Sequence, residues 1–214
     1  LNLKNNKVKL ILAAHFQPEA TSFPEGYRYG NHIDILIEIR RLGYNEEFFY
    51  KEHPGSEMYF WPIGPTKVAT YRSKTYFKQL LSLKCFFLDL NLSLYEVNRR
   101  IKNLLPITCT GTIAMQRSLM GLHTIITGEP WYKGLPGTIH ISNIRSLKEI
   151  PKEYVITDNQ LKVKAINFLE KKLNNRSLVN TSGIGMTESP KYNEYKTKKF
   201  EQEIFLLLNK LKKF

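Results

Sequence analysis

The sequence predicts an α/β fold in which helices flank an open, mostly parallel sheet. Two observations favour this fold class. Short apolar runs alternate along the chain with segments whose apolar residues recur at helical spacing, which is the pattern of βαβ units. The first of these runs is continuously apolar from Leu10 to Ala14, as expected for a strand that is buried on both faces of a parallel sheet.

The predicted strands are short apolar runs that end in turn residues or at the start of a helical pattern. The first, residues 8–14 (VKLILAA), is bounded by polar residues on both sides. In the second, Phe48 and Phe49 precede a Pro-Gly stop that ends the strand. The complete set of predicted strands is 8–14, 47–51, 84–90, 105–108, 123–127 and 138–141.

The predicted helices carry terminal signals as well as helical spacing. Gly43 follows the first helix as its C-terminal cap, and Ser73 is the N-cap of the second. Ser93 is followed three residues later by Glu96, which predicts a capping box. The predicted helices are 32–42, 73–83, 93–104, 113–120 and 158–173.

The character of the sequence changes after Ile150. An amphipathic helix is predicted first, then a Ser-, Asn- and Gly-rich loop at 176–192, then a second basic amphipathic helix at 195–214. We therefore divide the chain into an α/β domain, 1–150, and a C-terminal helical extension, 151–214. Because the sequence begins at Leu1 and not at Met, we interpret it as part of a longer protein with a domain upstream.

Composition and charge restrict the class of protein. Hydrophobic residues make up 42% of the 214 residues and aromatic residues 12%, which argues against wholesale disorder. No apolar run has the length of a membrane span, and no signal peptide is visible. The formal charge of +13 implies an anionic partner, and nucleic acid, an anionic membrane surface and a phosphorylated small molecule all fit. Most of the excess lies at 162–172 and 191–213, where a solvated basic helix face is the ordinary explanation.

The two cysteines give an expectation about the compartment. Cys85 and Cys109 both have apolar neighbours, so we expect buried free thiols in neighbouring strands, as in a reducing compartment. There is no CxxC and no paired His-Cys spacing, which disfavours a zinc site.

The loop after the first strand, AAHFQPEATSFPEG, is long enough to suggest a function. Gln17 and Glu19 flank Pro18, which fixes the backbone between them. An amide and a carboxylate held there fit a hydroxylated ligand or a base edge. An ordinary surface loop is the alternative.

The loop after the second strand places His53 at the carboxyl end of the sheet, where Pro54 turns the chain. Ligands bind at that edge of open parallel sheets. An imidazole there can contact a phosphate or act as an acid or base, and a purely structural or exposed histidine is the alternative.

Two further loops follow the strands at 105–108 and 123–127. Thr110, Gly111 and Thr112 precede a helix and combine hydroxyls with a close backbone approach, which fits a phosphate, although they also fit an ordinary N-cap. The other loop carries secondary candidates for a sugar or base face, with a hydrophobic plug under a turn as the alternative. These secondary candidates are Glu129, Trp131 and Tyr132.

The order and spacing of four segments resemble the capsule polysaccharide biosynthesis family, which includes bacterial Kdo transferases. The four segments are FQPEAT, YKEHP, TCTGTIAMQRSLMG and GEPWYKGLPG. The resemblance covers about residues 8–150. It implies one Rossmann-like half of a GT-B glycosyltransferase, the C-terminal donor-binding part. The implied function is transfer of a sugar, Kdo, from a CMP-sugar in the biosynthesis of capsule or other surface polysaccharide.

The resemblance also implies roles for individual residues. The donor's nucleotide and phosphate would be bound by Gln17, Pro18, Glu19, His53, Pro54, Thr110, Gly111 and Thr112. Glu19 and His53 are the candidates for catalysis in this chain. The sequence departs from the family pattern at Glu129 and Pro130, where a short aspartate-containing loop is expected, and at His123, where proline is common.

The implied partners are a CMP-sugar donor, a glycan or glycolipid acceptor and an N-terminal GT-B domain. In GT-B enzymes that domain usually supplies the acceptor site and often the catalytic carboxylate. No cofactor or metal is expected, since there is no DxD-like acidic cluster and the groups named above can carry the electrostatic role. The implied location is cytoplasmic, peripheral to the inner face of the cytoplasmic membrane.

Two other functions stay open at this point. The first is a non-catalytic nucleotide- or glycan-binding scaffold domain in a polysaccharide assembly or export system. The second is nucleic-acid binding, which ranks last because the basic residues lie on C-terminal helices, away from the strand-end loops. We expect those helices, 195–214 above all, to contact an anionic membrane surface or an anionic partner instead.

Overall fold

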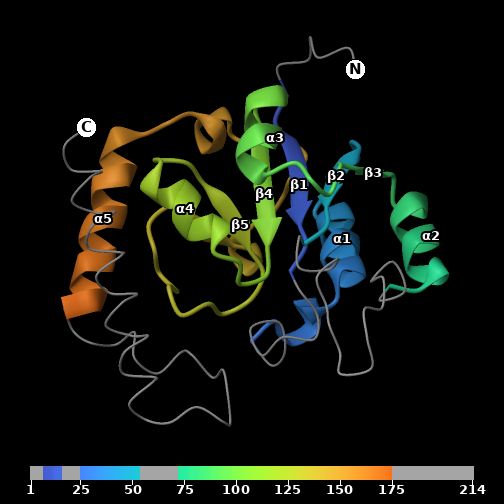
Figure 1. Cartoon of the computed structure of the whole chain (residues 1–214), viewed down its shortest axis with the longest axis horizontal. Helices are drawn as coiled ribbons and strands as arrows, with labels where there is room; N and C mark the ends of the chain where they lie inside the picture. The colour runs from blue at the N-terminus through green and yellow to red at the C-terminus, as the bar shows by residue number, and fades with distance from the viewer. Residues whose placement is uncertain (1–6, 16–24, 54–71, 175–214) are drawn as a thin grey trace.

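A computed structural model describes residues 7–15, 25–53 and 72–174. They form one open sheet of six parallel strands in the order β3-β2-β1-β4-β5-β6 (Figure 1). This confirms the predicted α/β class and gives a Rossmann-like sheet. The strands are β1 (Lys9–Ala13), β2 (Phe48–Lys51), β3 (Cys85–Phe87), β4 (Leu104–Thr108), β5 (Thr124–Ile126) and β6 (Thr138–His140).

The helices lie on both faces of the sheet. The α-helices are α1 (His32–Arg41), α2 (Lys74–Ser82), α3 (Leu94–Arg100), α4 (Ile113–Leu119) and α5 (Asn159–Asn174). Short 3-10 segments are η1 (Tyr27–Gly30), η4 (Ile141–Asn143) and η5 (Lys152–Val155). Helices α1 and α2 cover one face, α3 and α4 cover the other, and α5 packs beside α4 (Figure 1).

The alternation of side chains along the strands supplies both faces with a core. On β1, Leu10 and Leu12 pack toward α1 and α2, whereas Ile11 packs toward α3. All three side chains are fully buried. The continuous apolar run in the sequence therefore reflects burial on both sides, as predicted.

The helix termini follow the predicted caps with one correction. Ser93 and Glu96 form the capping box of α3, and Ser73 accepts a hydrogen bond from the backbone of α2. Gly43 follows α1 with a φ of +96°, a conformation that suits glycine. Helix α3 was predicted to run to residue 104 but ends at Arg100, because the backbone of Ile101 is extended, with φ −117° and ψ 109°. A left-handed residue, Asn103, then precedes β4.

The two cysteines are buried free thiols, but they do not lie in neighbouring strands. Cys85 is on β3 and Cys109 follows β4, with β2 and β1 between those strands. Burial raises the pKa of Cys85 to about 12 and that of Cys109 to about 11. The prediction of adjacency was wrong because the order of strands in the sheet does not follow their order in the chain.

Beyond residue 150, η5 contacts β4 and α5 packs against α4 through Ala165, Ile166 and Leu169. The division of the chain at residue 150 stays a prediction. No helix within the described ranges is long and apolar enough to cross a bilayer. The predicted helix at 195–214 lies outside the described residues.

Candidate functional site

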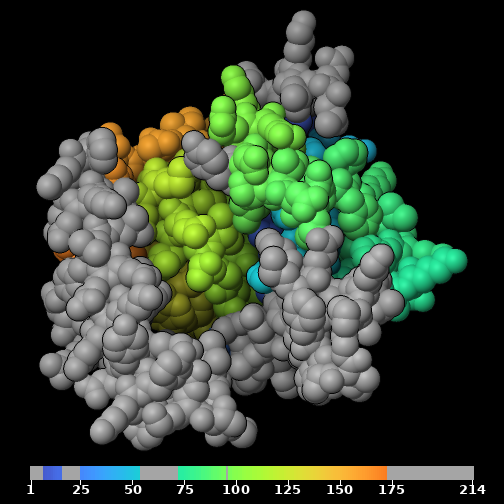
Figure 2. All heavy atoms as spheres, in the orientation of Figure 1, coloured from blue at the N-terminus to red at the C-terminus, as the bar shows by residue number. Residues whose placement is uncertain are grey.

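A cleft opens where the sheet changes the direction of its connections. The chain leaves β1 toward α1 on one face and leaves β4 toward α4 on the other, although β1 and β4 are adjacent strands. The carboxyl ends of such a strand pair are the usual ligand site of an open α/β sheet. Here they border a cavity of about 990 Å³. Figure 2 shows the surface hollowed between α3, in green, and α4, in yellow-green.

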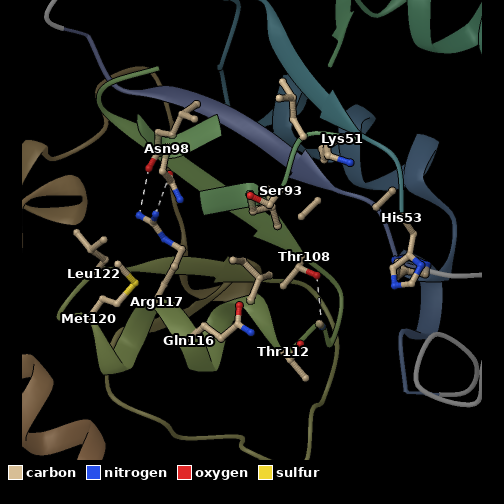
Figure 3. Close-up of a pocket in the computed structure, with 18 of the residues that line it drawn as sticks. Lys51, His53, Ser93, Asn98, Thr108, Thr112, Gln116, Arg117, Met120 and Leu122 are labelled. Carbon is tan, nitrogen blue, oxygen red and sulfur yellow. Dashed lines mark hydrogen bonds between the residues drawn. The ribbon is translucent and has the colours of Figure 1, made fainter. Parts of the chain in front are cut away.

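The walls of the cleft are α3 and α4, and a hydrogen bond joins them. Arg117 Nη1 on α4 donates to Asn98 Oδ1 on α3 at 3.2 Å (Figure 3). Ala13 on β1 and Thr108 on β4 line the cleft near its floor, and Gln116 of α4 reaches into it. Small or hydroxyl-bearing floor residues leave room for a ligand next to the backbone.

Arg117 also ties α4 to the sheet. Its Nε donates to the carbonyl of His123 at 3.0 Å and its Nη2 to the carbonyl of Leu104 at 3.1 Å. The side chain is almost fully buried, and this burial lowers the pKa of Arg117 to about 10, so that it stays protonated at neutral pH. A permanent cation therefore lies within the wall of the cleft.

The electrostatic character of the cleft is cationic. Among the described lining residues, Lys51, Arg99 and Arg117 are cations, and Glu52 is the counterpart carboxylate. Lys51 is buried, and its Nζ donates to the carbonyl of Leu90 at 2.8 Å and to that of Glu52 at 3.2 Å. These charges favour an anionic ligand.

His53 lies where the sequence predicted it, two residues beyond the end of β2, and lines the cleft (Figure 3). Its backbone N–H donates to Glu52 Oε1 at 2.8 Å. Arg72 holds the same carboxylate through two nitrogens. Burial alone would raise the pKa of Glu52, but the hydrogen bonds and charge of Arg72 outweigh it and hold that pKa below its usual range. Glu52 is thus an ionised anchor for the His53 backbone.

The loop after β4 brings Thr110, Gly111 and Thr112 to the same cleft. The Gly111 N–H donates to Thr108 Oγ1 at 3.3 Å, and the Gly111 carbonyl accepts from the Tyr132 hydroxyl at 2.6 Å. Thr112 makes no side-chain cap hydrogen bond to α4. Thr108 and Tyr132 therefore hold the backbone of this loop at Gly111.

The secondary candidates after β5 separate in the structure. Trp131 lines the cleft, whereas Tyr132 is fully buried beneath the Gly111 loop and presents no ring surface to a ligand. Glu129 pairs with Lys133, with Oε2 and Nζ 2.7 Å apart. Glu129 is not among the described residues that line the cleft.

A chain of buried hydrogen bonds runs behind the cleft to Glu52. The His15 backbone N–H donates to His32 Nε2 at 3.2 Å, so the proton of neutral His32 lies on Nδ1 and is donated to the Tyr76 hydroxyl at 2.7 Å. Tyr76 and Tyr50 share a hydrogen bond of 3.0 Å, and Tyr50 donates to Glu52 Oε2 at 2.8 Å. Each hydrogen bond of this series then contains one proton, and the series ends at the carboxylate of Glu52.

Burial accounts for the protonation states along this chain. It lowers the pKa of His32 well below the usual value, and the nearby charges of His15 and Arg72 act in the same direction. Burial likewise raises the pKa values of Tyr50 and Tyr76. The two tyrosines are therefore neutral donors at physiological pH.

The structure brings some predicted site residues together and leaves others untested. His53, Thr110, Gly111 and Thr112 share the cleft with Trp131. Four predicted residues, Gln17, Pro18, Glu19 and Pro54, lie outside the described residues.

Several cleft residues were missed in the sequence. They are His15, Lys51, Asn98, Arg99, Gln116 and Arg117. Lys51 did carry a signal in the sequence. It lies two residues after Phe49 and therefore on the same face of β2, the face toward α3 and α4. Asn98, Arg99 and Arg117 looked like polar faces of surface helices.

Within the described ranges, no group of three or more His, Cys, Asp or Glu side chains is arranged to hold a metal ion. The expectation of chemistry without a metal or cofactor stays a prediction.

Comparison with known proteins gives one distant structural similarity. The solved structure of the β-Kdo 2,7 transferase KpsC of Thermosulfurimonas dismutans matches with 18% sequence identity and a TM-score of 0.46. The match covers 76% of this chain and 46% of that one, so this chain spans less than half of that transferase. No family model and no curated protein match the sequence.

Proposed function

We propose that the chain is the donor-binding part of a GT-B glycosyltransferase that uses a CMP-activated sugar, with Kdo as the sugar. The observation that carries the proposal is the cationic cleft at the switch point between β1 and β4. Its volume of about 990 Å³ suits a ligand of nucleotide-sugar size. The choice of CMP and Kdo comes from the sequence resemblance, as does a role in surface polysaccharide biosynthesis.

The proposed chemistry is stabilisation of a leaving phosphate. When a CMP-sugar reacts, negative charge develops on the phosphate of CMP, and preorganised donors and cations lower that barrier. His53 and Lys51 approach the cleft from β2, and the hydroxyls of Thr110 and Thr112 approach it from the loop after β4. We assign these four residues to the donor phosphate. The acceptor, a glycan or glycolipid, would bind to a domain outside this chain.

Calorimetric titration tests the proposal directly. The chain is titrated with CMP, UMP, UDP and ADP, and the titrations are repeated with His53→Ala. We expect selective binding of CMP, weakened at least tenfold by His53→Ala, as for loss of a hydrogen bond to a charged group. His140→Ala is the matched control, because His140 bonds to Ser142 on the far edge of the sheet and does not line the cleft.

Two outcomes would contradict the proposal. Equal binding of all four nucleotides would remove the assignment to a CMP-sugar. Selective CMP binding that survives in His53→Ala but is lost in His140→Ala would place the nucleotide elsewhere on the molecule.

A further inference from the structure

His15 follows β1, lines the cleft and contacts groups on two sides of its ring. Its Nε2 lies 2.9 Å from the carbonyl oxygen of Gly30, and its Nδ1 lies 3.1 Å from His32 Nε2. A carbonyl oxygen can only accept, so Nε2 of His15 carries a hydrogen in the first contact. A neutral imidazole then has a lone pair on Nδ1.

The second contact does not suit a neutral His15. His32 Nε2 accepts from the His15 backbone N–H, so it presents its single lone pair on this side. In neutral His15 with the hydrogen on Nε2, the Nδ1 lone pair therefore lies 3.1 Å from that of His32 Nε2. The other neutral tautomer donates to His32 but places a lone pair against the Gly30 carbonyl. In the imidazolium form, Nε2–H donates to Gly30, and Nδ1–H shares the His32 lone pair with the His15 backbone N–H.

The surroundings oppose that charge while the cleft contains no anion. His15 is 5% exposed, and burial is the main reason why its pKa is lowered to about 4. The hydrogen bond to Gly30 raises the pKa, Arg72 and His53 lower it, and Glu52 raises it. The polar geometry of His15 thus favours the cation, whereas burial and the neighbouring cations disfavour it.

We propose that His15 becomes an imidazolium when a phosphate or a similarly charged anion enters the cleft, so that anion binding takes up one proton from solvent. The proton adds to Nδ1 and is donated to His32; no covalent bond between heavy atoms forms or breaks. The negative charge of the anion offsets the desolvation that disfavours the imidazolium, since a nearby opposite charge favours the ionised form. Proton uptake on binding of any phosphate-like anion does not depend on the proposed function. The identification of that anion as the phosphate of CMP rests on it.

Proton uptake is measured on the histidine rings themselves. The ring nitrogens of the ¹⁵N-labelled chain are followed by NMR between pH 4 and 8, with and without sodium sulfate, at constant ionic strength. Sulfate stays doubly charged throughout, so it binds no proton itself. We expect the pKa of His15 to move upward by about one to three pH units. The titratable and charged groups near His15 include His32 on α1, Arg72 before α2, and Glu52 and His53 after β2.

His123 is the internal control in the same sample. Burial also lowers its pKa, but it lies directly before β5, against Tyr154, and does not line the cleft. Its pKa should stay constant when sulfate is added. A second control is His15→Gln, which retains a side-chain donor but cannot be charged, and which should bind sulfate about ten- to a hundredfold more weakly at pH 5.

A parallel titration with CMP separates the two proposals. If sulfate raises the pKa of His15 and CMP does not bind, the inference holds and the proposed donor fails. If CMP binds while both probes leave His15 neutral across the range, the inference is overturned and the proposed donor stands. A shift of His15 no larger than that of His123 overturns it as well.

Discussion

Glu52 and Arg72 form a bidentate pair behind the cleft, in which Arg72 Nε lies 2.5 Å from Oε2 and Nη2 lies 3.0 Å from Oε1. Both side chains are largely buried, at 6% exposure for Arg72 and 17% for Glu52. The same carboxylate accepts from the His53 backbone and from Tyr50. The pair therefore holds the residues that directly follow β2, and with them the backbone of His53.

Replacement of Arg72 should destabilise the fold strongly. Arg72→Met removes the cation and leaves Glu52 buried and charged, a change that typically costs about 3–5 kcal/mol. We expect the free energy of unfolding in urea at pH 7 to fall by about that amount. Adding Glu52→Gln should restore part of the loss, because the buried charge is then gone. If the double variant is as unstable as the sum of the two single variants, the two side chains are not coupled.

Stability should decrease as the pH falls from about 6.5 toward 4. The pKa values of His15, at about 4, and of His32 are lowered in the folded state, so the unfolded chain binds protons first. The stabilising contribution of each neutral histidine is complete above pH 6.5 and is lost below it. The slope is about 1.4 kcal/mol per pH unit for each histidine. Glu52, whose pKa is also lowered, contributes only at lower pH, where it becomes protonated.

Urea unfolding at half-unit pH steps measures this slope. His32→Gln should flatten it, since glutamine does not titrate, whereas His140→Ala, on the far edge strand and outside the His15–His32 contact, should leave it unchanged. An equal slope in wild type and His32→Gln between pH 4 and 6.5 would contradict the assignment.

The parts of the fold that the sequence predicted correctly depend on local interactions. The capping box of Ser93 and Glu96 forms within one helical turn, and β1 is buried on both faces, as its composition predicted. His53 was located correctly because a strand that ends in a turn places its next residues at the carboxyl edge. The early end of α3 was missed because the backbone becomes extended at Ile101, a residue that carries no helix-stop signal in the sequence.

Long-range pairings explain what the sequence did not reveal. Asn98 and Arg117 lie on different helices, and each resembles a surface position in its own helix. His15 and His32 meet because the chain returns from the end of β1 to the start of α1 through η1. No periodicity records such pairings, so the cationic wall and the histidine pair required the tertiary structure.

Gly128 should be needed for the position of the loop after β4. A Cβ at this position would lie 2.8 Å from Cys109 Sγ, 2.8 Å from Thr110 Cγ2 and 2.9 Å from the Glu25 carbonyl oxygen. Gly128→Ala must therefore displace the Thr110 loop, and we expect a loss of about 1–3 kcal/mol in unfolding free energy. Calorimetry should show weaker binding of CMP as well.

Gly43→Ala is the matched control for that experiment. Gly43 has a φ of +96° at the end of α1, so alanine is strained there, but the residue does not line the cleft. Both variants should lose stability, and Gly128→Ala alone should lose affinity. Equal affinity for CMP in the two variants would mean that the position of the loop at Gly128 does not affect nucleotide binding.

Asn98→Asp should weaken anion binding without unfolding the protein. A carboxylate can accept the same hydrogen bond from Arg117 Nη1, now assisted by charge, so we expect unchanged or slightly higher stability in urea. The added negative charge in the wall of the cleft should reduce the affinity for sulfate and for CMP. This difference from wild type should narrow at high salt, since the screening length falls from about 10 Å at 0.1 M to about 3 Å at 1 M. Asn98→Leu, which leaves Arg117 Nη1 without this acceptor, should instead lower stability by about 1–3 kcal/mol. Undiminished anion affinity in Asn98→Asp at low salt would mean that the ligand binds away from the wall between α3 and α4.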